Sequence, residues 1–92
     1  MTFRYIILGS GKQGTAAAYD LARFGEAEQI IMADVRAEAA EAAAARVNRL
    51  IGRPVAIARR LDVADEAALQ EALRGNDVAL SAVTYYFNVA IT

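Results

Sequence analysis

A glycine-rich hexapeptide constrains the fold of this chain more than any other feature. The letters GSGKQG, residues 9–14, follow the apolar run YIIL and precede an alanine-rich stretch. Glycine inside a helix or strand costs roughly 0.5 to 1 kcal/mol relative to alanine, so three glycines in six residues need a reason. Either the chain turns very tightly there, or another group comes very close to the backbone.

Four short segments around this hexapeptide are predicted to be strands. They are rich in β-branched residues and bounded by glycine, proline or asparagine, and they cover Arg4–Leu8, Gln29–Asp34, Pro54–Asp62 and Asp77–Val83. Their nearly continuous apolar character is typical of parallel strands, which are covered on both faces.

Three helices are predicted between the strands, at about Lys12–Phe24, Arg36–Gly52 and Asp65–Arg74, with glycines at or just beyond their ends. The second should bury one stripe, formed by Ala40, Ala43, Ala44, Val47, Leu50 and Ile51. The third should begin at the capping residue Asp65 and turn Leu69, Ala72 and Leu73 inward. The alternation predicts an α/β fold, a Rossmann-type parallel sheet of four strands with helices on both faces.

In this context the hexapeptide fits the dinucleotide-binding pattern G-x-G-x-x-G, between a strand and a helix. Gly9 would make the tight turn, Gly11 would let a pyrophosphate approach the backbone, and Gly14 would let the helix pack closely on the sheet. The amide groups at the helix N-terminus would face the phosphates. Lys12 is expected to be a solvent-facing neighbour of the phosphates rather than an essential ligand.

Asp34 is the second part of the pattern. It ends a predicted strand twenty residues after Gly14, where a carboxylate is expected to accept hydrogen bonds from the adenosine ribose hydroxyls. The alternative is an ordinary cap for the second helix, and both roles can coexist. A carboxylate there repels a 2′-phosphate and favours NAD over NADP, although Arg36 could pair with that phosphate.

Two further groups are placed at the site by topology, because ligands bind at the carboxyl ends of the strands. Asp62 and Val63 should flank the adenine, and Ser81, Ala82 and Val83 should lie near the nicotinamide half. The plain alternatives are a helix cap for Asp62 and a turn residue for Ser81.

Composition excludes several other functions. Histidine and cysteine are absent, which removes the usual zinc ligands and any Ser-His or Cys-His pair, and no catalytic or metal-binding set is predicted. The net charge is −1 and the only basic doublet, Arg59 with Arg60, is interpreted as a solvated strand end, so no nucleic-acid partner is expected. There is no membrane-length apolar run and no leader pattern, so we expect a soluble, cytoplasmic protein.

The stretches ILGSGKQGTAAAYDLARFG, MADVR, RLDVADEAAL and NDVALSAVTYYFN together resemble the N-terminal cofactor domain of the saccharopine dehydrogenase family. That family includes lysine 6-dehydrogenase-like and saccharopine reductase-like enzymes. The most specific match is Gln13 in the glycine loop combined with residues 81–88, and the chain departs from the family pattern at Thr84, where proline is expected. The resemblance implies NAD(P)-linked chemistry at a carbon–nitrogen bond of an amino-acid or opine-type substrate.

The chain is expected to be one incomplete cofactor domain, residues 1–92, of a longer enzyme whose substrate domain would follow. We expect it to bind cofactor without catalysis by itself. The alternative from another class is a nucleotide-sensing regulatory domain that does no chemistry. A purely structural α/β unit explains neither the three glycines nor Asp34.

The last predicted strand, Asp77–Val83, is expected to have no further strand of this chain beside it, and the tail TYYFNVAIT adds more apolar residues. Unpaired strand edges and apolar patches attract partners. The sequence therefore predicts self-association through this strand and the tail.

Overall fold

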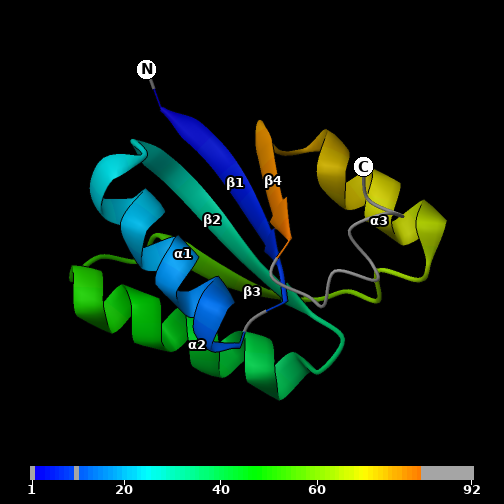
Figure 1. The fold of residues 1–92 in the computed structure, drawn as a ribbon, viewed down its shortest axis with the longest axis horizontal. Helices are drawn as coiled ribbons and strands as arrows, with labels where there is room; N and C mark the ends of the chain where they lie inside the picture. The colour runs from blue at the N-terminus through cyan, green and yellow to red at the C-terminus, as the bar shows by residue number, and fades with distance from the viewer. Residues whose placement is uncertain (1, 10, 82–92) are drawn as a thin grey trace.

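The computed structural model describes residues 2–9 and 11–81, and the chain alternates strand and helix throughout them (Figure 1). The elements are β1 (Phe3–Leu8), α1 (Lys12–Phe24), β2 (Ala27–Asp34), α2 (Ala37–Ile51), β3 (Ala56–Arg60), α3 (Glu66–Arg74) and β4 (Val78–Ser81). The α/β alternation predicted from the sequence is confirmed. The third strand is shorter than predicted, because residues 61–63 already belong to the turn that leads to α3.

The strands form one parallel sheet in the order β3-β2-β1-β4. β1 lies inside the sheet, with Ile6 paired to Ile31 of β2 on one side and to Ala79 of β4 on the other. The chain therefore winds outward from β1 through β2 to β3, and then returns across the sheet to β4. This reversal of direction is the Rossmann-like arrangement that the sequence predicts.

The helices cover both faces of the sheet. α1 and α2 lie over one face, where Ala18 and Val47 pack with Ile7 and Met32 in a buried cluster. α3 covers the other face, where Leu69 packs in a second cluster with strand residues that include Ile6 and Leu8. Alternate residues of β1 and β2 thus enter opposite cores, as the period of two along a strand requires.

Leu50 is a correction to the predicted helix stripe. The stripe residues Ala40 and Val47 are fully buried and Ile51 packs at the margin of the core, but Leu50 is 55% exposed. At 3.6 residues per turn Leu50 lies roughly 80° around the helix from Ala40, whereas Ile51 is almost in line with it. Leu50 therefore lies on the flank of α2 and not on the line that meets the sheet.

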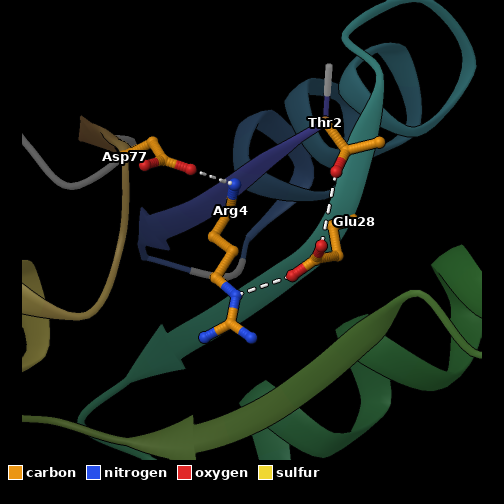
Figure 2. Close-up of polar contacts among 4 residues, drawn as sticks. All are labelled: Thr2, Arg4, Glu28 and Asp77. Carbon is orange, nitrogen blue, oxygen red and sulfur yellow. Dashed lines mark hydrogen bonds and ion pairs between the residues drawn. The ribbon is translucent and has the colours of Figure 1, made fainter.

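The amino edge of the sheet is held by a polar cluster (Figure 2). The register between β1 and β2 shifts after Phe3, so Glu28 has no partner of its own in the ladder. Its carboxylate accepts hydrogen bonds from Arg4 Nε at 2.8 Å and Thr2 Oγ1 at 3.3 Å. The Asp77 carboxylate accepts one from the Arg4 amide at 2.8 Å, so Arg4 links β1 both to β2 and to the start of β4.

Within residues 2–9 and 11–81, no helix is long and apolar enough to cross a membrane.

Candidate functional site

The candidate site lies at the carboxyl edge of the sheet, opposite the Arg4 cluster. β1 ends there at Leu8 and β2 ends there at Asp34, and the chain leaves these two strands for helices on the same face. The return to β4 passes over the other face through α3. A crevice at such a change of direction is the usual ligand site of an open parallel sheet.

The fold itself requires glycine at positions 9 and 14. Gly9 has φ of 99°, a left-handed conformation that glycine adopts without strain, and its amide donates to Ala33 O at 2.7 Å. A Cβ on Gly14 would collide with the carbonyl group of Gly9 and would touch the Ile7 side chain. The tight turn and the close packing of α1 on β1 therefore explain two of the three glycines.

Neither backbone conformation nor packing within the chain requires glycine at position 11. It is the N-cap of α1 with φ of −65°, and a Cβ there would meet nothing within 4 Å. No acidic residue stands in the first turn of α1, whose leading amide groups have no partner inside the helix. The open space beside the Gly11 backbone lies at a helix N-terminus and fits a phosphate group. Contact with a phosphate is the role that the sequence predicts for Gly11.

Asp34 ends β2, Asp62 follows the end of the neighbouring strand β3 by two residues, and both make the same local turn. Asp34 Oδ1 accepts from the Arg36 amide at 3.0 Å, and Asp62 Oδ1 accepts from the Ala64 amide at 2.9 Å. The residue at the N-cap of α2 is Arg36, so Asp34 is not the helix cap considered as its alternative role. α3 is capped by Asp65, whose carboxylate accepts from Ala68 N, so Asp62 is not a helix cap either.

A pocket of about 170 Å³ brings four of the predicted residues together. It is lined by Gly9, Ala33, Asp34, Val35, Leu61, Asp62 and Val63. This volume is below the roughly 300 to 1,000 Å³ of pockets that hold a whole ligand, so it suits one end of a dinucleotide. Val35 and Ala33 were not predicted to line the site, because their place depends on the turn after β2 and on which face of β2 meets the pocket.

The remaining predicted residues lie around this pocket rather than in it. Lys12 and Gln13 are exposed in the first turn of α1, and Arg36 is exposed at the start of α2. Lys12 and Gly11 line a wider groove of about 580 Å³ between α1 and α2. Ser81 ends β4, and its Oγ is buried without a hydrogen-bond partner among the described residues. Ala82 and Val83 lie outside the described residues.

A family model that matches nearly the whole chain identifies the family. Residues 5–92 match the family model described as the saccharopine dehydrogenase NADP binding domain. The chain belongs to this family. The resemblance noted in the sequence is thereby confirmed, and the Gly9–Gly14 loop, Asp34 and Asp62 all lie within the matched residues of the saccharopine dehydrogenase domain.

Two solved structures share the fold. A quinate dehydrogenase from Corynebacterium glutamicum in complex with NAD superposes with a TM-score of 0.74 at 22% identity, over 87% of this chain and 26% of that one. An apo, histidine-tagged saccharopine dehydrogenase (L-Glu forming) from Saccharomyces cerevisiae gives 0.73 at 28% identity, over 94% of this chain and 18% of that one. The chain thus spans about a quarter or less of the length of these enzymes.

Proposed function

We propose that this chain is the dinucleotide-binding part of an NAD(P)-dependent oxidoreductase that acts on a carbon–nitrogen bond of an amino-acid or opine-type substrate. Membership of the saccharopine dehydrogenase domain family supports the cofactor class and the reaction class. The fold shared with a dehydrogenase in complex with NAD supports a nicotinamide dinucleotide as the ligand. The substrate groups would come from other parts of a longer enzyme.

The observation that carries the cofactor assignment is the open backbone at Gly11. Gly9 and Gly14 are required by the fold, but Gly11 has room for a side chain and still has none. A pyrophosphate that rests on this backbone and on the first-turn amides of α1 accounts for the glycine. Lys12 and Gln13, in the same turn, would border the phosphates.

With the pyrophosphate at Gly11, the rest of the dinucleotide would extend along the carboxyl edge of the sheet. The Asp34 carboxylate would accept hydrogen bonds from the adenosine ribose hydroxyls, and the adenine would lie by Asp62 and Val63 in the pocket. Ser81 would lie near the nicotinamide half together with Ala82 and Val83. The bound nicotinamide supplies hydride transfer, whereas these residues only hold and orient it.

The same site should prefer NAD to NADP. The Asp34 carboxylate would repel a 2′-phosphate in the position where it accepts from a 2′-hydroxyl. Arg36 offers a cation two residues later, so the preference should be modest rather than absolute.

Binding and reaction are tested separately. Titration of the chain with NADH should give a saturable fluorescence change that ADP-ribose competes away, and a linear response would contradict cofactor binding. For the reaction, a longer protein that contains this chain should reduce NAD in the presence of an amino acid or an opine-type secondary amine. Turnover only with hydroxy acids such as quinate would contradict the carbon–nitrogen assignment.

A further inference from the structure

Arg60 of β3 is the register partner of Asp34 of β2. The backbone confirms the pairing, because the Leu61 amide donates to the Asp34 carbonyl oxygen at 2.8 Å. Neighbouring strands lie roughly 4.8 Å apart, so an arginine side chain on β3 is long enough to reach the groups around Asp34.

Asp34 and Arg60 also share a face of the sheet. Two residues earlier on the same strands, Met32 pairs with Ala58, and both pack in the core on the α1 and α2 side. The period of two puts Asp34 and Arg60 on that side as well, one step nearer the carboxyl edge. Arg59 pairs with Ala33, which is buried in the opposite core, so Arg59 points to the other face.

Arg60 is available to bind a ligand. It is exposed, and its guanidinium makes no hydrogen bond or ion pair with the residues that the structure describes. Arg36, also exposed, lies at the start of α2, and its amide donates to the Asp34 carboxylate. One arginine thus follows Asp34 by two residues, and another lies opposite it on β3.

We propose that Arg60 is a specificity-determining residue that lets this site accept a 2′-phosphate, and so NADP as well as NAD. This inference rests on the proposed cofactor site. A guanidinium presents a planar pair of donors that matches phosphate oxygens, and its charge offsets the repulsion that Asp34 exerts on them. The aspartate alone selects for the ribose hydroxyl, whereas the aspartate with Arg60 tolerates either group.

The test compares NADH and NADPH binding to the chain and to the variants Arg60→Ala and Arg59→Ala. The unchanged chain should bind both nucleotides, NADH more tightly than NADPH but by less than about tenfold. Arg60→Ala should weaken NADPH by about tenfold and leave NADH within about twofold, because only NADPH carries the phosphate. Arg59→Ala removes the same charge from the adjacent position on the other face, and should leave the ratio of affinities unchanged.

Three outcomes would overturn the role of Arg60: an unchanged ratio in Arg60→Ala, equal losses for both nucleotides, or the same ratio change in Arg59→Ala. Arg60→Gln serves as a second variant if circular dichroism shows that the alanine variant is unfolded. Failure of the unchanged chain to bind either nucleotide would instead contradict the proposed function. NADH binding without NADPH binding in the unchanged chain would leave the proposed function standing and contradict this inference alone.

Discussion

The carbonyl oxygen of Gly9 occupies the space that a side chain on Gly14 would need, with Ile7 close behind it. Gly14→Ala must therefore push α1 away from β1 or distort the turn. We expect it to lower the free energy of unfolding by about 1 to 3 kcal/mol, as overpacking does in a dense core. Urea denaturation followed by circular dichroism measures this change.

Gly11→Ala is the matched control, because a Cβ at Gly11 meets nothing within 4 Å. Its unfolding curve should lie close to that of the unchanged chain. Equal stability losses in the two variants would contradict the separate reasons given for the two glycines.

Asp34→Ala should weaken NAD binding by about 1 to 3 kcal/mol, because the ribose hydroxyls lose their acceptor. Its effect on NADP should be smaller or opposite, since the repulsion on the 2′-phosphate is also removed. Isothermal titration calorimetry with both nucleotides checks this, with Glu71→Ala on the exposed side of α3 as the control. Equal affinities for NAD and NADP in the unchanged chain would count against the role of Asp34.

The Arg4–Glu28 pair should make a small, pH-dependent contribution to stability. The hydrogen bond from Arg4, its charge and the Thr2 hydroxyl hold the pKa of Glu28 below its ordinary value of 4.5. A carboxyl whose pKa is lower in the folded chain stabilises the fold fully above its ordinary pKa, and this stabilisation fades as the pH falls through the folded value.

Glu28→Gln should therefore lower Tm slightly at pH 7, and the difference from the unchanged chain should shrink below pH 4.5. Added salt should shrink it too, because both side chains are about half exposed. Thermal melts across this pH range measure the difference. A constant difference from pH 7 to pH 3 would show that charge is not its source.

The β4 side of the sheet should mediate self-association. Val78 and Leu80 are each 38% exposed there, and among the described residues β4 pairs only with β1. Unpaired apolar edges favour a two-fold dimer. Sedimentation equilibrium should show a dimer that Leu80→Lys weakens, with Phe87→Asp as a second probe in the tail that lies outside the described residues. A strict monomer at high micromolar concentration, or a dimer that both substitutions leave intact, would contradict this prediction.

Much of this fold could be predicted because local signals agree with it. Glycines 25, 52 and 75 mark the ends of the three helices, and Asp65 marks the start of the third. The place of Asp34 at the end of β2 follows from the apolar run before it. The strand order follows from the doubly wound arrangement that is typical of a dinucleotide-binding fold.

Register and flanking positions could not be predicted in the same way. The position of Arg60 opposite Asp34 depends on how β2 and β3 align, and a slip of one residue would turn Arg60 to the other face. The shift that directs Glu28 toward Arg4 is likewise a property of the pairing and not of either strand. Leu50 shows that helical periodicity predicts which residues lie near a buried stripe but not where the edge of that stripe falls.

The most direct test of the cofactor site is an NADH titration of Gly11→Val beside Gly75→Val. Both glycines cap helix ends with negative φ and have nothing within 4 Å of an added Cβ, but only Gly11 lies at the proposed pyrophosphate contact. We predict roughly micromolar to millimolar binding for the unchanged chain and for Gly75→Val, and no saturable binding for Gly11→Val. A folded Gly11→Val chain that binds NADH as tightly as the unchanged chain would contradict the account.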